Sequence, residues 1–213
     1  MIQIIEQDNY KVALNLARNK FAQQDPVVQA KRCGCEILQK PDGTAEIIVP
    51  YFDIKCLITH PEGLIANMDS DDSIEEWEQI LLLHYLTSTD PVQTPGDPVS
   101  FAQIPSGEFY YPAFQKRIKQ PFLKVFGENP DLLIKAARKL GGEKFECSGD
   151  CGVILKPFPL IKLYFILWKS DEEFPADVNL LLSSSISSFL STEDVAVLGG
   201  IAVGKLVKTS KNL

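Results

Sequence analysis

Residues 141–184 read GGEKFECSGDCGVILKPFPLIKLYFILWKSDEEFPADVNLLLSS, and this stretch decides the fold class. Runs rich in β-branched and aromatic residues alternate with Gly, Pro, Ser and Asp, a pattern typical of short strands joined by turns. It predicts four strands, at residues 144–147, 152–155, 160–169 and 178–184. Predicted helices lie before and after these four strands, and none lies between them.

The residues upstream and downstream predict two more strands and several helices. Strands are expected at 33–40 and 44–58, with Pro41 to Gly43 as the turn and with Pro50 dividing the second strand or marking a sheet edge. Helices are expected at 10–21, 74–86, 107–126, 131–140 and 192–207. Ser73 and Glu76 have capping-box spacing, and Pro112 and Pro121 are expected to interrupt the third helix. This order predicts an α+β fold with an antiparallel or mixed sheet and segregated helices.

Length and composition are those of a globular chain. With 213 residues, of which 45% are hydrophobic, we expect a single domain that spans residues 1–213. The loop at 87–100, rich in Thr, Pro, Ser and Gly, is the expected place for a subdomain boundary.

Charge and hydropathy argue against nucleic-acid and membrane partners. The net charge is −7, from 21 Lys and Arg against 28 Asp and Glu, and the basic residues fall in short groups on expected helices. The most hydrophobic stretch, 155–168, contains two Lys and two Pro, and the N-terminus does not resemble a secretory leader. We therefore expect a cytoplasmic protein, in which the five cysteines are free thiols or metal ligands.

The cysteines form two close pairs. A Ser-Gly-Asp turn would place Cys147 opposite Cys151, and Cys33 and Cys35 would share one face of a strand. Together the four thiolates would suffice for a zinc ion or an iron–sulfur cluster. The alternatives are a pair that oxidises reversibly, and buried thiols without a ligand, since free Cys is often part of a core.

An acidic run follows the longest expected strand. Asp171, Glu172 and Glu173 would bind a hard cation or serve acid–base chemistry, with Trp168 and Phe174 as pocket walls. A solvated turn is the alternative. Because Pro175 restricts the backbone, we expect Glu173 to point inward.

Aromatic and basic residues alternate at 109–117. Tyr111, Phe114 and Arg117 suit a flat ligand with carboxylates, such as a tetrapyrrole, and Trp168 and Glu173 would complete that site. The alternative is that these aromatic residues belong to the core. The sequence shows no phosphate-binding loop, dinucleotide fingerprint, serine-hydrolase elbow or zinc-protease motif, so whether the chain is an enzyme stays open.

These segments, in this order, resemble the family of domains of unknown function numbered 3786. The resemblance covers the chain from about residue 75 and is carried by the runs 82–86, 111–114, 157–159 and 171–175, of which Asp-Glu-Glu-Phe-Pro at 171–175 is the most specific. It differs at Leu182-Ser183, where a Phe-Asp pair is expected.

The resemblance implies a bacterial or archaeal protein, common in anaerobes, in a family whose members include some that carry or neighbour an iron–sulfur domain. We therefore expect a cofactor- or partner-binding accessory module of anaerobic metabolism, which binds a corrinoid or other tetrapyrrole, or an iron–sulfur or corrinoid protein. One alternative is a metal-dependent enzyme that uses Asp171, Glu173 and Asp150. The other is a structural or interaction domain without a small-molecule site.

Overall fold

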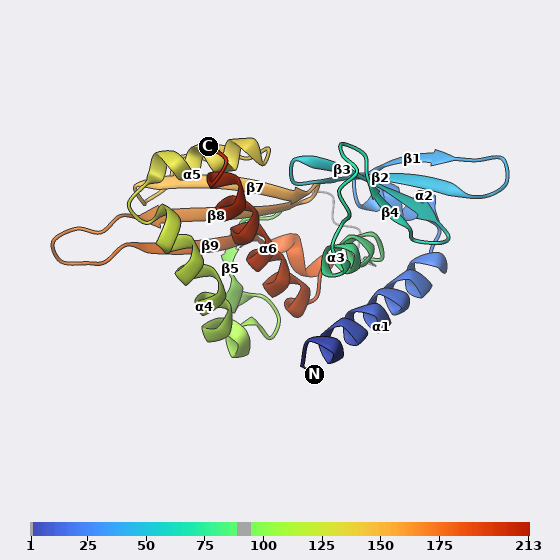
Figure 1. Ribbon diagram of the computed structural model, residues 1–213, viewed down its shortest axis with the longest axis horizontal. Coiled ribbons are helices and arrows are strands. Elements are labelled where there is room, and N and C mark those ends of the chain that lie inside the picture. The colour runs from blue at the N-terminus through green and yellow to red at the C-terminus, as the bar shows by residue number, and fades with distance from the viewer. Residues whose placement is uncertain (1, 89–94) are drawn as a thin grey trace. The chain divides into compact units, whose positions relative to one another are not determined.

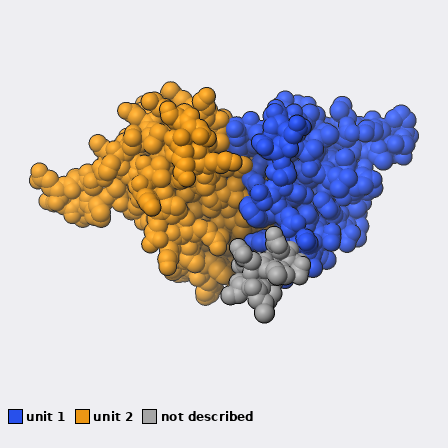
Figure 2. Space-filling model, viewed as in Figure 1, with its two compact units in different colours: residues 1–93, 188–190 blue, residues 94–187, 191–213 orange. Residues whose placement is uncertain are grey.

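The computed structural model describes residues 2–88 and 95–213, and these residues form two compact units. Unit 1 contains residues 1–93 and 188–190, and unit 2 contains residues 94–187 and 191–213 (Figure 2). The expected boundary loop at 87–100 lies partly outside the described residues. Helices and two antiparallel sheets together confirm the α+β class.

Unit 1 is a four-stranded antiparallel sheet with three helices (Figure 1). Its elements are α1 (Ile2–Ala22), α2 (Pro26–Arg32), β1 (Glu36–Gln39), β2 (Ala45–Tyr51), β3 (Ile54–His60), β4 (Ile65–Asn67) and α3 (Glu76–Leu86). The strands follow one another in the order β1-β2-β3-β4. Helix α1 packs on α3, where Arg18 donates to the Gln79 side chain at 3.2 Å, and its buried Phe21 meets His60 of β3 edge-on with centroids 5.1 Å apart.

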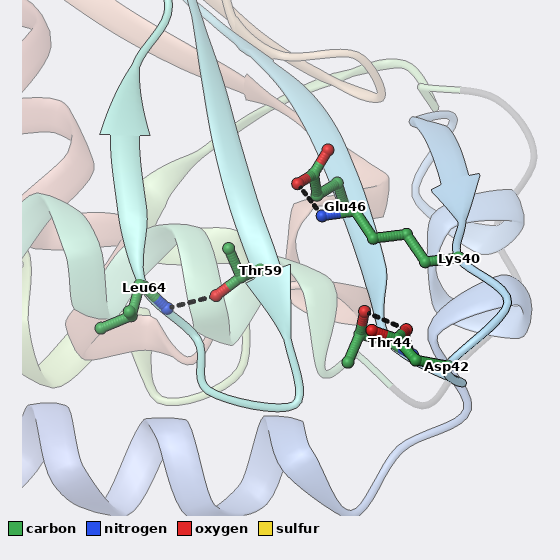
Figure 3. Close-up of polar contacts among 6 residues, drawn as sticks. All are labelled: Lys40, Asp42, Thr44, Glu46, Thr59 and Leu64. Atoms are coloured by element: carbon green, nitrogen blue, oxygen red, sulfur yellow. Dashed lines mark hydrogen bonds and ion pairs between the residues drawn. The ribbon is translucent and has the colours of Figure 1, made fainter.

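The β1–β2 hairpin turns where the sequence predicts it. The Asp42 carboxylate accepts hydrogen bonds from the Thr44 amide at 3.0 Å and the Thr44 hydroxyl at 2.7 Å (Figure 3). Gly43 has a φ of +88°, a backbone conformation that glycine adopts at low cost. Lys40 and Glu46 form an ion pair across the two strands, and on β3 the Thr59 hydroxyl accepts the Leu64 amide at 3.3 Å.

The segment 44–58 holds most of two strands rather than one. The chain reverses at Phe52-Asp53, where Phe52 has a φ of +52°, so β2 and β3 pair in a tight hairpin with Tyr51 opposite Ile54. Pro50 stays inside β2 and does not divide it. Pro50 lies two residues after Ile48, the last β2 residue that pairs with β1. On that side of β2 no strand pairs with Pro50, so it marks a local sheet edge where its missing amide hydrogen costs no hydrogen bond.

Several helix starts differ from the prediction. Helix α1 begins at Ile2, eight residues before the predicted start at residue 10. Helix α3 begins at Glu76 after an extended Glu75 without a side-chain cap, so the predicted capping box of Ser73 and Glu76 is wrong. Helix α2 was not predicted, because seven residues are too few to show a period; Asp25 caps it by accepting the amides of Val27 and Val28.

Unit 2 is a five-stranded antiparallel sheet with three α-helices, and two short 3-10 helices, η1 (Phe101–Gln103) and η2 (Ser184–Ser188), lie before α4 and α6. Its elements are β5 (Pro98–Ser100), α4 (Gly107–Phe126), α5 (Pro130–Lys139), β6 (Glu143–Phe145), β7 (Cys151–Phe158), β8 (Ile161–Trp168), β9 (Asp177–Ser183) and α6 (Thr192–Ser210). The sheet order is β5-β9-β8-β7-β6. Helix α4 runs without interruption through Pro112 and Pro121, contrary to the prediction. Each proline is exposed, so water can satisfy the carbonyl that it leaves unbonded.

All three helices of unit 2 cover the same face of its sheet. Phe122 of α4 stacks on Phe165 of β8 with ring centroids 5.4 Å apart. A Cβ atom at Gly199 of α6 would lie 3.0 Å from Phe114 and 3.4 Å from Leu180, so the missing side chain lets α6 approach both α4 and β9. The Cys151 thiol of β7 faces the start of α5. Among the described residues, no helix is long and apolar enough to cross a bilayer.

Candidate functional site

The second face of the five-stranded sheet is an apolar surface opposite the face that α4, α5 and α6 cover. Because side chains alternate along a strand, the residues next to Phe165 and Val153 point to this face. We call it the open face; its residues are Phe145, Ile154, Tyr164, Ile166, Trp168, Asn179 and Leu181. Ile166 is buried and the others are half-buried.

Aromatic rings form the centre of the open face. Tyr164 lies directly across from Ile154 on β7 and from Leu181 on β9, and Phe145 meets its ring edge-on with centroids 5.7 Å apart. Burial raises the pKa of the Tyr164 hydroxyl, and the nearby Asp97 carboxylate adds to this while Lys156 opposes it. The hydroxyl is therefore a neutral hydrogen-bond donor at pH 7, attached to an apolar surface.

One edge of the open face carries charge. Glu143 on β6 and Lys156 on β7 form an ion pair at 2.9 Å, and this pair, with Lys162 nearby, holds the Glu143 pKa below its ordinary value. Lys162 lies two residues before Tyr164 on the same strand and therefore on the same face. With the Asp97 carboxylate near Tyr164, two Lys and two carboxylates lie around the apolar centre, and their charges balance.

Cys147 and Cys151 do not face each other. The predicted turn required Cys147 to pair with Cys151, but the register pairs Phe145 with Gly152, one residue away from that alignment. A shift of one residue moves side chains to opposite faces. The Cys151 thiol therefore points to α5, with its sulfur 3.9 Å from the Pro130 carbonyl, whereas the Cys147 sulfur lies 2.8 Å from where a Gly152 Cβ would be, on the open face.

Cys33 and Cys35 belong to unit 1 and do not lie on a strand. They follow α2, and the Cys33 thiol donates to the Tyr85 carbonyl at 3.2 Å while the Tyr85 hydroxyl donates to the Cys33 carbonyl at 2.7 Å. Burial raises the pKa of Cys33 to about 11 and that of Cys35 further. Within the described ranges 2–88 and 95–213, no three His, Cys, Asp or Glu side chains are grouped to hold a metal ion.

The raised pKa of Cys33 predicts a loss of stability in alkali. Its folded-state pKa of about 11 exceeds the ordinary 9.0, so the stabilising contribution is complete below pH 9 and disappears as the pH rises through 11. We expect the free energy of unfolding in urea to fall by about 2–3 kcal/mol more in the native chain than in Cys33→Ala between pH 8 and 11. Parallel pH profiles for the two proteins would contradict this.

The acidic run is a hydrated turn. The Asp171 carboxylate accepts the amides of Glu173 and Phe174 at 2.8 and 2.7 Å, and these two bonds lower its pKa. Asp171, Glu172 and Glu173 are all exposed, so the prediction that Glu173 points inward is wrong. The turn is short enough for the Asp171 carboxylate to fix its backbone. Pro175 is itself exposed, so it does not hold a neighbouring side chain against the core. Asp150, the third predicted carboxylate, accepts the Lys169 amide at 2.8 Å.

This exposure predicts that Glu172 and Glu173 contribute little to stability. Replacing both with Gln should change the free energy of unfolding by no more than about 0.5 kcal/mol, because neither charge is desolvated. Urea unfolding at pH 7 measures this, with Asp171→Asn as the comparison, since it weakens the acceptor of two backbone bonds. If the double Gln variant lost more unfolding free energy than Asp171→Asn, at least one of the two Glu carboxylates would be buried and paired in the folded protein.

The five residues predicted to bind a cofactor do not form one site. Phe114 is in the core, stacked on Phe101 with centroids 4.0 Å apart, and Arg117 is exposed beside Gly200 of α6. Tyr111 also lies on α4, which covers the helix-bearing face of the sheet. Trp168 lies on the open face, and Glu173 lies in the turn that follows β8. Of the five, only Trp168 belongs to the open face.

The residues around Tyr164 were not predicted as a site. The available signal was the run 161–168, in which the alternate positions Tyr164, Ile166 and Trp168 are as apolar as the positions between them. A strand with two apolar faces is expected inside a parallel sheet covered on both sides. In an antiparallel sheet with helices on one face, the same pattern indicates a surface available for a ligand or partner.

Comparison with known proteins identifies a family but no activity. The model of a family described as "Domain of unknown function (DUF3786)" matches residues 25–205, which is most of the chain. No curated protein matches the chain, and no solved structure matches it either.

Proposed function

Since the chain belongs to the family DUF3786, which has no assigned function, we propose from its surface that it is a cofactor- or partner-binding accessory module of anaerobic metabolism. The ligand class that we propose for the open face is a corrinoid or other tetrapyrrole. One observation carries this proposal: an apolar, aromatic sheet face that none of the unit's own helices covers.

The dimensions and chemistry of the open face support a flat ligand. Residues i and i+4 on a strand are about 13 Å apart, and three neighbouring strands span about 10 Å, so the area from Ile154 to Leu181 and from Tyr164 to Trp168 is comparable in size to a macrocycle. Within this area Gly149 lies against the buried Ile166, so the ligand would contact the rings on either side of it. Aromatic rings stack favourably on a conjugated plane. Lys162, beside Tyr164, supplies a positive charge for a peripheral carboxylate.

The two alternative functions differ in the support that the described residues give them. A metal-dependent enzyme would need Asp150, Asp171 and Glu173 to converge, but the first two carboxylates bind backbone amides and the third is exposed. A structural or interaction domain without a small-molecule site would use the same apolar face to bind a protein partner, and the titration below distinguishes that alternative from the proposal.

The test is a titration of the anaerobically purified chain with haem, cobinamide and cobalamin, followed by the visible absorption spectrum. The proposal expects a saturable spectral change at one ligand per chain for at least one of these compounds. It also expects a higher melting temperature with that ligand, because binding to the folded state stabilises it. Linear, unsaturated responses to all three compounds would remove the tetrapyrrole from the proposal.

A further inference from the structure

The charges of the chain are segregated between its two halves. Residues 1–94 contain seven Lys and Arg against fifteen Asp and Glu, a net charge of −8, whereas residues 95–213 contain fourteen against thirteen, a net charge of +1. The acidic character of the protein, −7 in total, therefore comes entirely from the first half. Between residues 56 and 115 there is no Lys or Arg at all.

Within unit 2, the positive charge is gathered on the helix layer. Ten basic residues lie on α4, α5 and α6 or at the C-cap of α6, against four acidic ones, which are all in first helical turns. Eight of the basic residues are exposed, and we call them the basic helix face: Lys116, Arg117, Lys124, Lys135, Arg138, Lys139, Lys208 and Lys211. Of the other two, Lys119 is paired with Asp177 at 2.7 Å.

Helix dipoles explain only part of this arrangement. Lys124, Arg138, Lys139 and Lys208 lie in last turns, where a positive charge is favoured. Lys116, Arg117 and Lys135 lie in helix interiors, where the dipole gives no such preference. Helices α4 and α6 run side by side in the same direction (Figure 1). Near their starts the Thr192 hydroxyl donates a hydrogen bond to the Pro105 carbonyl, and further along Gly200 lies against Arg117. Their basic C-terminal halves therefore coincide.

From this segregation we propose that the basic helix face docks on the acidic N-terminal unit of a second copy of the chain. The densest negative segment there is 69–76, where Asp69, Asp71, Asp72 and Glu75 are exposed. The contact joins two different patches, so a pair of copies can make it once, head to tail, or twice, about a two-fold axis. It uses the helix side of unit 2, the side of the sheet opposite the open face.

Salt dependence separates this association from ordinary colloidal behaviour. Copies with a net charge of −7 repel one another most strongly at low salt, where screening is weakest. Docking between opposite charges has the reverse dependence, because screening weakens the attraction. The proposal therefore predicts a weight-average mass that rises with protein concentration at low salt and is lower at high salt. Repulsion between copies of net charge −7 would not produce this combination.

The experiment is sedimentation velocity of the full chain in about 20 mM and about 500 mM salt, where the screening length falls from about 20 Å to about 4 Å. We expect a weight-average mass above the 23.7 kDa monomer at low salt and the monomer at high salt. Lys124→Glu with Lys208→Glu should weaken association at least tenfold. The control Lys20→Glu with Lys169→Glu makes the same charge change at exposed positions away from the basic helix face and should not weaken it.

A charge exchange completes the test. Asp71→Lys with Asp72→Lys should also abolish self-association, and mixing this protein with the Lys124→Glu, Lys208→Glu protein should restore a complex. A monomer at low salt at every concentration overturns the proposal, as does an association that the reversal weakens no more than the control does. An unchanged mass with the reversed charges would mean that these residues do not form the contact.

Discussion

Replacing Phe114 with Ala should lower the free energy of unfolding by about 3–5 kcal/mol, as expected for removing a large aromatic side chain from a core. Phe114 is only 3% exposed, is stacked on Phe101 and is within reach of Gly199 on the neighbouring helix. Its loss would leave a cavity where α4, α6 and the segment before α4 meet. Urea unfolding followed by circular dichroism measures the effect.

Phe109 is the matched control for this substitution. It lies on the same helix, five residues earlier, and is 86% exposed, so Phe109→Ala should change stability by less than about 0.5 kcal/mol. If Phe114→Ala proved as mild as Phe109→Ala but abolished ligand binding, Phe114 would be a binding residue and not a core residue.

Replacing Tyr164 with Asp should weaken tetrapyrrole binding at least a hundredfold, about 2.7 kcal/mol. The change removes the ring at the centre of the open face and places a carboxylate near Asp97, where a ligand carboxylate would be repelled. Tyr164→Ala, which removes the ring without adding charge, should weaken binding by a smaller factor. Visible-spectrum titration gives the affinities.

Tyr110→Asp makes the same chemical change at a tyrosine of α4 that is 60% exposed, on the helix side of unit 2. It should leave the affinity within about twofold of the unchanged chain. Melting curves of all three variants establish that each is folded. Equal losses of affinity in Tyr110→Asp and Tyr164→Asp would show that charge, and not position on the open face, governs binding.

Much of the fold could be predicted because its signals are local. The strands around residues 152–155 and 160–169 combine β-branched and aromatic residues with turn residues at both ends, and the structure places β7 and β8 there. The Asp42-Gly43 turn formed as expected, since the Asp side chain caps the backbone two residues on. The short β4 and β5 gave no such signal, because three residues are too few to show alternation.

The candidate site was harder to predict because it depends on register and on which face the helices cover. One residue of register separates a Cys147–Cys151 pair from the observed arrangement, and nothing in the Ser-Gly-Asp segment itself fixes that register. Likewise, the aromatic residues of α4 look alike in sequence, yet Phe114 is buried and Phe109 is exposed. Their difference arises from packing against α6, whose sequence lies about 80 residues away.

The most direct test of the proposed site is the fluorescence of Trp168. The chain has two tryptophans, so Trp77→Phe leaves Trp168 on the open face as the single emitter. Adding the tetrapyrrole that gives the strongest spectral response should quench this emission and saturate at one ligand per chain. The same titration of Trp77→Phe combined with Tyr164→Asp should show no saturable quenching. Quenching that grows linearly with ligand, or that saturates identically in both proteins, would contradict binding at the open face.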